Sequence, residues 1–315
     1  MPQYDKRLLS QQAKELNFIR DTYEKVFRLT KVLEYFNNDP TVSECLALKG
    51  GTAINLTIFN MPRLSVDIDF DYMRNNSREE MLREREEINR IINAYMAMEG
   101  YNLSAKSKSY HSLDSLVFSY INSAGIKDNI KIETNYSLRC HVLPRESRSI
   151  ETLKVFSPIK IMTLNPIEIF ASKIVALLSR TAARDLYDIN NMLRFGIVNE
   201  SDEYILRKCI VFYTAITSEI IPATYEVDCI ESLTEYKIRT SLNPVIRKSE
   251  KFDLEKVKKN VKEYLSDLLV LTGNEKKFLN AFRDREYLPE LLFEGEILRR
   301  IKEHPMALWK TRPKQ

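Results

Sequence analysis

The sequence is short of the residues that build disulfide frameworks and zinc sites. Its four cysteines, Cys45, Cys140, Cys209 and Cys229, lie far apart and form no Cys-x-x-Cys pair, and its three histidines show no ligand spacing. Disulfides and a zinc site are therefore not expected. Separated thiols of this kind fit a reducing compartment, so we expect the chain to work in the cytoplasm.

Long apolar segments are also missing. No run approaches the roughly 18–20 apolar residues that a membrane span needs, and residues 1–16 are polar, without the apolar core of a signal peptide. We therefore expect no membrane partner. With 315 residues, 44% of them hydrophobic and 29% charged, the composition is that of a globular chain of about two domains. The formal net charge of +4 permits an anionic partner but does not require one.

The order of expected elements divides the chain into two halves. In the first half, apolar spacing predicts helices over residues 11–37, 52–59 and 78–99, and strands over residues 45–48, 66–72, 115–121, 129–136 and 159–164. Asn165 followed by Pro166 is typical of a helix start, and almost everything after it has helical spacing. The expected fold is α+β, with a mixed-sheet domain over residues 1–164 and a helical domain over residues 165–315.

Glycine is scarce, yet two of the seven glycines stand side by side in Gly50-Gly51-Thr52. Glycine lets backbone N–H groups approach a ligand closely, and a helix that starts there adds a favourable field for phosphate. The stretch is not a Walker motif, because no Gly-Lys-Ser or Gly-Lys-Thr follows it. A phosphate cradle is one interpretation of this turn.

Alternating carboxylates follow the glycines on a predicted strand. Asp67 and Asp69 share one face, while Ile68 and Phe70 point to the core. A half-buried strand with a solvated acidic face would have the same pattern. Beside a phosphate cradle, however, a carboxylate pair suits Mg²⁺, which takes one or two carboxylates together with phosphate oxygens of the substrate. Two metal ions would need a third carboxylate, for which Glu133 is the candidate, although it also fits an exposed strand position.

A second group of charges lies in the predicted helical half. Lys173 and Arg180 are seven residues apart and therefore share a helix face, and two cations on one face can hold a triphosphate. Asp185 and Asp188 follow, and Arg184 stands four residues before Asp188. A salt-bridged surface helix would look the same and would gain only a few tenths of a kcal/mol per pair.

Together the two motifs resemble a known group of enzymes. Gly50-Gly51-Thr52 followed by Arg63-Leu64-Ser65-Val66-Asp67-Ile68-Asp69 is similar to the signature of the DNA polymerase β-like nucleotidyltransferases, and more narrowly of the AbiEii abortive-infection toxins. A later helical motif of that family is matched by the following residues: Pro166, Glu168, Ala171, Lys173, Ala176, Leu177, Arg180, Arg184, Asp185, Leu186, Tyr187 and Asp188. The match is close over residues 46–72 and 166–193.

The resemblance implies a Mg²⁺-dependent nucleotidyltransferase toxin that moves NMP from an NTP. Asp67, Asp69 and Glu133 would hold the metal, with Lys173 and Asp188 also catalytic. The nucleotide would be bound by Gly50, Gly51, Thr52, Arg63, Ser65, Lys173, Arg180 and Asp185. Arg63 also fits a structural partner of the carboxylates.

The acceptor and the partners follow from the same resemblance. It implies an RNA acceptor, foremost the 3′ end of tRNA, and an antitoxin partner. Protein as an acceptor stays open. The lysines of residues 256–262 and the basic tail fit either a phosphate-backbone track or a solvated helix and a frayed end. The competing interpretation is a non-catalytic module that binds nucleotide or antitoxin on a degenerate transferase fold.

Overall fold

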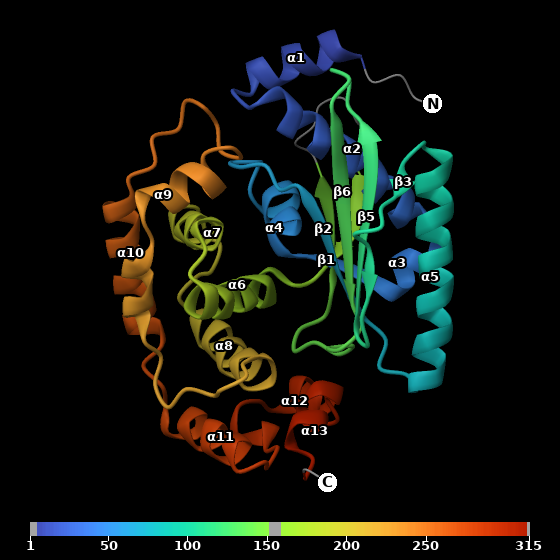
Figure 1. Ribbon diagram of the computed structural model, residues 1–315. Coiled ribbons are helices and arrows are strands. Elements are labelled where there is room, and N and C mark those ends of the chain that lie inside the picture. The colour runs from blue at the N-terminus through green and yellow to red at the C-terminus, as the bar shows by residue number, and fades with distance from the viewer. Residues whose placement is uncertain (1–4, 151–158, 314–315) are drawn as a thin grey trace. The chain divides into compact units, whose positions relative to one another are not determined.

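The computed structural model describes residues 5–150 and 159–313. They group into two compact units, which we describe separately (Figure 1). The first unit holds residues 1–139, 145–164 and 243–250, and the second holds residues 140–144, 165–242 and 251–315. Among the described residues, no helix is long and apolar enough to cross a membrane.

A mixed eight-stranded sheet forms the centre of the first unit. Its strand order is β3-β5-β6-β2-β1-β8-β7, and β4 pairs with β5. The strands are β1 (Leu46–Lys49), β2 (Asp67–Tyr72), β3 (Asn102–Leu103), β4 (Lys108–Ser109), β5 (Leu113–Ile121), β6 (Lys127–Asn135), β7 (Glu146–Ile150) and β8 (Ile159–Thr163). The pairs β2–β6 and β1–β8 are parallel, and the others are antiparallel. The sheet is therefore mixed, as expected.

Helices accompany this sheet. They are α1 (Lys6–Glu15), α2 (Arg20–Asn38), α3 (Pro40–Cys45), α4 (Gly50–Ala53) with the π-helical turn η1 (Ile54–Ile58), and α5 (Arg78–Met98). The long helix α5 runs beside the β3 and β5 side of the sheet (Figure 1). It starts with a capping box in which Ser77 and Glu80 exchange hydrogen bonds, and it ends before Gly100, which has a φ of 81°.

The expectation of one helix over residues 11–37 was wrong. The chain leaves α1 after Glu15 and enters α2 at Arg20, with Asn17 in the left-handed region at a φ of 61°. Phe18, between the two helices, is buried. The turn lets both helices pack an apolar side, because asparagine tolerates left-handed backbone better than most residues.

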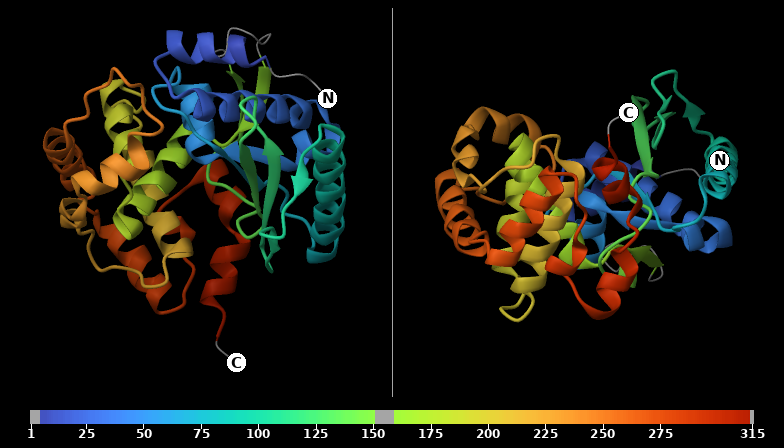
Figure 2. Two further views of the ribbon diagram at one scale, coloured as in Figure 1. Left: turned by 45° about the horizontal axis from the view of Figure 1, so that its top comes forward. Right: turned by 90° about the horizontal axis from the view of Figure 1, so that it is seen from below.

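The second unit is helical over its described residues. It contains α6 (Pro166–Arg180), α7 (Ala183–Arg194), α8 (Glu203–Thr217), η2 (Val227–Ser232), α9 (Glu235–Lys237), η3 (Ile238–Leu242), α10 (Leu254–Leu268), α11 (Gly273–Arg283), η4 (Pro289–Leu291), α12 (Gly295–Ile301) and α13 (Pro305–Thr311). Helix α6 packs on α7 and α8, and α10 packs on α7 (Figures 1 and 2). The Asn165 side chain accepts a hydrogen bond from the Ile167 N–H at the start of α6, the cap predicted from Asn165-Pro166.

Two short segments belong to a different unit from their sequence neighbours. Residues 243–250 join the first unit, where Leu64 N–H donates to the Val245 carbonyl at 2.7 Å and Lys248 N–H donates to the Asn17 carbonyl at 2.7 Å. Residues 140–144 join the second unit. A single boundary at residue 164 is therefore too simple, because backbone hydrogen bonds between distant segments decide the grouping.

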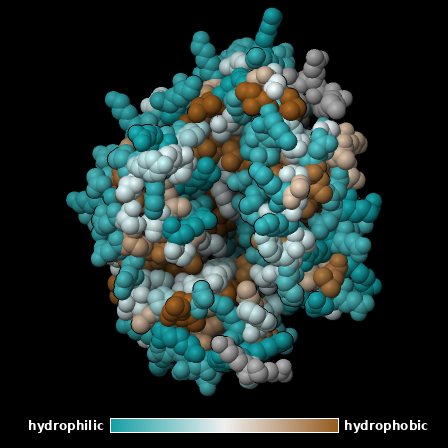
Figure 3. Space-filling view, in the orientation of Figure 1, coloured by the Kyte–Doolittle hydropathy of each residue, from teal (hydrophilic) through white to brown (hydrophobic). Residues whose placement is uncertain are grey.

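Hydrophilic side chains predominate on the molecular face drawn in Figure 3, with hydrophobic ones in smaller groups. Hydrophobic side chains are concentrated instead in the cores of the two units. In the first unit, Leu48, Ile68 and Ile132 on adjacent strands have no exposed surface. In the second, Leu177 and Leu186 are equally buried. Burial of such side chains stabilises each by about 1.5–3 kcal/mol relative to exposure.

Candidate active site

The two adjacent glycines lie against charged and polar side chains of the first unit. Gly50 has a φ of 66°, and a Cβ atom built on it would lie 2.7 Å from Asp69 Oδ2. A Cβ on Gly51 would lie 2.7 Å from Arg63 Nη2 and 2.9 Å from Ser65 Oγ. The structure thus brings these five predicted residues together, and only glycine leaves room for their contacts.

The Thr52 side chain is fully buried and points away from solvent. Its hydroxyl donates a short hydrogen bond to the backbone carbonyl of Asp67. This bond joins the third residue of the Gly50-Gly51-Thr52 turn to the first residue of β2. The side chain of Thr52 therefore supports Asp67 at the start of β2, and the part of Thr52 in nucleotide binding stays a prediction.

Asp67 and Asp69 are both half-buried on one face of β2, as strand alternation predicts. Asp71 lies two residues further but is only 1% exposed, and its Oδ1 is 2.6 Å from Lys49 Nζ. Antiparallel pairing of β1 with β2 places Lys49 beside this acidic face. Lys49 was missed in the sequence because only the strand pairing shows that it lies next to the aspartates.

The parallel partner strand β6 adds one acid and one base. Asp67 is in register with Lys131, and Asp69 is in register with Glu133, so the four side chains share a face. Lys131 Nζ lies 2.8 Å from Glu133 Oε1. Burial lowers the pKa of Lys131, but the Glu133 hydrogen bond and the charges of Glu133, Asp67 and Asp69 raise it overall above its ordinary value. The lysine therefore carries its charge within the carboxylate group.

The donors in this face suit a hard divalent cation, although they do not form a closed cage. Among the described residues, no three His, Cys, Asp or Glu side chains are placed together to hold a metal ion. Asp67 and Asp69 supply two carboxylates near Gly50, which suits Mg²⁺ because this ion binds few protein ligands and takes phosphate oxygens and water for the rest. Glu133 lies beside them, with its carboxylate ion-paired to Lys131.

In the second unit, Lys173 lies between two carboxylates. Its Nζ is 3.0 Å from Asp185 Oδ1 and 3.0 Å from Asp188 Oδ2. Lys173 is 9% exposed, and Asp185 and Asp188 are almost fully buried. Arg180 Nε donates to Asp185 Oδ2 at 2.8 Å, while 64% of the Arg180 side chain is exposed. The two cations share a helix face, as predicted, and they meet at Asp185.

Glu168, a residue of the same helical motif, serves a different purpose. It is fully buried and accepts hydrogen bonds from the Val142 and Leu143 N–H groups at 2.7 and 3.1 Å and from the Tyr213 hydroxyl. Burial raises its pKa above the ordinary value, against the opposing effects of His141 and these donors. Glu168 fixes residues 140–144 on the second unit, a role that sequence spacing does not reveal.

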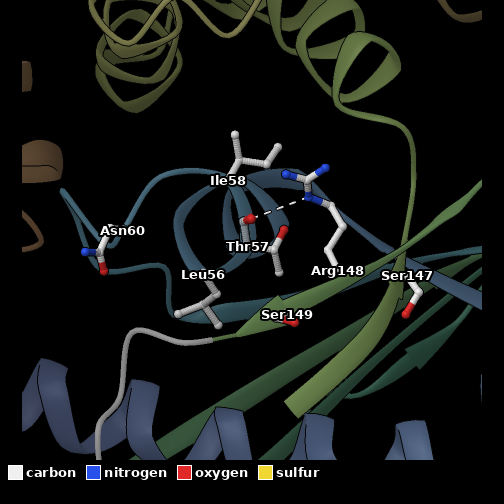
Figure 4. A pocket seen from close by; sticks show the side chains of 7 residues that line it. All are labelled: Leu56, Thr57, Ile58, Asn60, Ser147, Arg148 and Ser149. Atoms are coloured by element: carbon white, nitrogen blue, oxygen red, sulfur yellow. Dashed lines mark hydrogen bonds between the residues drawn. The ribbon is translucent and has the colours of Figure 1, made fainter. Parts of the chain in front are cut away.

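A separate polar cavity of about 560 Å³ lies in the first unit between η1 and β7 (Figure 4). Its described lining consists of Leu56, Thr57, Ile58, Asn60, Ser147, Arg148 and Ser149. Arg148 Nε donates to the Thr57 carbonyl at 3.4 Å, and Nη1 is 3.1 Å from Glu146 Oε2. None of the predicted site residues lines this cavity.

The lysines of residues 256–262 are not uniformly free to follow a phosphate backbone. Lys258 Nζ is 3.0 Å from Glu255, and Lys262 Nζ is 2.8 Å from Asp228 and 2.7 Å from Glu231. The contacts of Lys262 join α10 to η2. The face therefore carries acids as well as bases, which favours the solvated-helix interpretation.

Comparison with known proteins gives a family and a similar fold. The family model described as "Nucleotidyl transferase AbiEii toxin, Type IV TA system" matches residues 31–284. No curated protein matches the sequence. Among solved structures, MenT4, a nucleotidyltransferase toxin from Mycobacterium tuberculosis H37Rv, has a similar fold, with a TM-score of 0.65, 18% identity and coverage of 98% of this chain and 100% of that chain.

The family match spans both the glycine–carboxylate cluster and the lysine–carboxylate cluster. The fold agrees with it, since a mixed sheet carries the first cluster and helices carry the second. The chain therefore belongs to the AbiEii family of nucleotidyltransferase toxins of type IV toxin–antitoxin systems.

Proposed function

We propose that the chain transfers a nucleoside monophosphate from an NTP to an acceptor in a Mg²⁺-dependent reaction centred on the Gly50–Asp69 contact. The close approach of the Gly50 backbone to the Asp69 carboxylate supports this most directly. It places a backbone position without a side chain directly beside carboxylate oxygens of the kind that bind divalent ions. A strand whose acidic face is merely solvated would not require a glycine this close to its carboxylates.

The residues of the first unit take complementary roles. Gly50 and Gly51 leave backbone N–H groups accessible to the β- and γ-phosphates, and the neighbouring guanidinium of Arg63 favours anionic oxygens. Asp67 and Asp69 would hold the divalent ions, with Glu133 as a third ligand or as the base for the attacking hydroxyl. When bound, these ions supply charge neutralisation to the reacting phosphate and the leaving oxygen.

The residues of the second unit are proposed for the same reaction on the strength of the family. Lys173 is assigned to the nucleotide phosphates and Asp188 to catalysis, with Asp185 orienting Lys173. The burial of the Lys173 ion pairs supports a fixed ammonium position, because a lysine held by two carboxylates loses little further freedom on binding. Arg180 is largely exposed and would have to exchange its hydrogen bonds to Asp185 to meet an incoming anion.

The acceptor that we propose is RNA, foremost the 3′ end of tRNA, whose modification would stop translation. The partners that we propose are NTP and a cognate antitoxin, and the compartment is the cytoplasm. Besides the metal and the NTP, the reaction requires only an acceptor hydroxyl, so the choice of RNA rests on the family and not on a described binding surface.

Label transfer from each of the four α-³²P-NTPs into total RNA and total protein tests this proposal. We expect Mg²⁺-dependent labelling of RNA by wild type and by Asp267→Ala, a control at an exposed aspartate of α10. Asp69→Ala should lose about a hundred- to a thousandfold in rate, as is usual when a group that stabilises transition-state charge is removed. Labelling of protein instead of RNA would show that the acceptor is a protein. Equal activity of folded Asp69→Ala would overturn the metal assignment, and no labelling by wild type would favour the non-catalytic binding module.

A further inference from the structure

The carboxylate face of the first unit contains a cation that its proposed chemistry does not use. Lys131 stands one strand away from Asp67 and two residues from Glu133, with its ammonium 2.8 Å from Glu133 Oε1. The Lys131 side chain is 37% exposed and that of Glu133 is 27% exposed. An ion pair this exposed adds little to stability by itself, typically about 0–1 kcal/mol. Its position among three carboxylates is the unusual feature.

At this position the ammonium of Lys131 would repel a divalent ion bound by Asp67 and Asp69. Three carboxylates that share one face of the sheet repel each other, and an ammonium among them offsets part of that repulsion. A divalent ion at Asp67 and Asp69 would meet the same ammonium as a like charge. Glu133, held by Lys131, is also drawn away from any metal at the two aspartates. The ion pair and the metal therefore compete for the same carboxylates.

An incoming nucleotide changes this balance. Its triphosphate brings several negative charges close to the cluster, and lysine carries its ammonium on a flexible four-carbon stem. The ammonium can exchange the Glu133 carboxylate for a phosphate oxygen by rotation about side-chain bonds alone. Glu133 then becomes available as a ligand or a base at the moment when the substrate is present.

We propose that Lys131 is a positioning residue that balances the carboxylate cluster in the free protein and passes to a nucleotide phosphate when metal and NTP bind. This inference rests on the proposed nucleotidyl transfer. It assigns to Lys131 two effects with opposite signs: it weakens metal binding in the absence of nucleotide, and it strengthens nucleotide binding in the presence of metal. A lysine that is only a solvated residue of the strand surface would produce neither of these two effects.

The test compares Lys131→Met with Lys131→Arg and with Lys127→Met. Lys127 is an exposed lysine of β6 on the same face, four residues and about 13 Å away along the strand. Mn²⁺ binding without nucleotide, measured by calorimetry on the full chain, should be about tenfold tighter in Lys131→Met, because a like charge near the ion is gone. Lys131→Arg and Lys127→Met should bind Mn²⁺ as wild type does.

Thermal melts and kinetics complete the test. Without metal, Lys131→Met should melt at a lower temperature than wild type, and Mn²⁺ should raise its melting temperature by more. At saturating Mg²⁺, the KM for NTP should rise about tenfold with kcat changed less than about threefold, because the lost contact is made to the bound substrate in ground and transition states alike.

The outcomes separate this inference from the proposed function. If wild type binds Mn²⁺ and transfers nucleotide while Lys131→Met matches Lys127→Met in Mn²⁺ affinity and in the KM for NTP, the role of Lys131 is overturned and the function stands. If wild type neither binds Mn²⁺ nor transfers nucleotide, both are overturned. Weaker Mn²⁺ binding by Lys131→Met would also contradict the proposal, since it would make the lysine a support of the metal site.

Discussion

At the scale of single residues, backbone conformation and side-chain charge are linked at Gly50. Its φ of 66° is unfavourable for any residue with a Cβ, and the space that a Cβ would fill is occupied by Asp69 Oδ2. A substitution at Gly50 would therefore both strain the backbone and displace the Asp69 carboxylate. Gly125, in the hairpin between β5 and β6, has a φ of 81° and open space within 4 Å of the position that a Cβ would take, so it separates the two effects.

We predict that Gly50→Ala abolishes nucleotidyl transfer, whereas Gly125→Ala leaves it intact. Left-handed backbone costs alanine about 1–2 kcal/mol at either position, so both variants should lose this much stability in urea unfolding, and Gly50→Ala should lose more because its Cβ meets Asp69 Oδ2. Only the variant at Gly50 forces Asp69 to move. Transfer rates that fall equally in the two variants would attribute the loss to backbone strain alone and remove the close-contact argument.

At the scale of elements, one buried carboxylate joins helix α6 to a segment that precedes it by more than twenty residues. Glu168 accepts from two N–H groups of residues 142 and 143, and its pKa is raised by burial. A folded pKa above the unfolded one means that the folded protein binds more protons between the two values. The stability from this site is therefore complete below the ordinary glutamate pKa of about 4.3. It is lost as the pH rises to the raised value.

We predict that the free energy of unfolding of wild type falls relative to that of Glu168→Gln as the pH rises through this window. Glutamine does not titrate, so the variant lacks this slope. The variant should also be less stable by about 1–3 kcal/mol at low pH, because its amide cannot accept from both backbone N–H groups. Urea unfolding across the pH range measures both effects, with Glu296→Gln, at an exposed position of α12, as control. A constant difference between wild type and Glu168→Gln would contradict the raised pKa.

At the scale of the whole molecule, the chain order does not coincide with the compact units. Residues 243–250 lie between helical segments of the second unit in sequence but hold the first unit together. Arg247 donates to the Leu16 carbonyl at 3.3 Å and to the Met61 carbonyl at 3.2 Å, and its guanidinium lies 5.1 Å from the Phe18 ring centre. One arginine thus ties the turn between α1 and α2 to the segment that leads into β2.

We predict that Arg247→Met speeds hydrogen exchange at residues 16–18, 61, 63 and 64 and leaves the exchange of α10 and α11 unchanged. The loss of two hydrogen bonds and one aromatic contact should destabilise the first unit by about 1–3 kcal/mol. Arg239→Met is the control, because Arg239 is an exposed arginine of η3 that lies over the Tyr236 ring. Equal exchange in wild type and Arg247→Met would show that the segment is only a passive connection.

Local chemistry in the sequence was sufficient for much of the architecture. Alternating side chains predicted β2 with Asp67 and Asp69 on one face, and the Asn165-Pro166 pair predicted the start of α6. These features depend on neighbours within a few residues, where steric preferences and hydrogen bonds are local. The short strands β3, β4 and β7 were not predicted, because pairing with a neighbouring strand and not their own side-chain spacing makes them strands.

The sequence by itself determined the family, the α+β composition and the residue types of the site, since the two motifs are contiguous patterns. Tertiary structure decided which groups touch. Strand register put Lys131 and Glu133 beside the aspartates. It also put Lys49 opposite Asp69, from where the Lys49 ammonium reaches Asp71. Folding buried the Thr52 hydroxyl against the Asp67 carbonyl and enclosed Lys173 between two carboxylates. These contacts join residues far apart in sequence, and their energies depend on burial and distance, which no local pattern encodes.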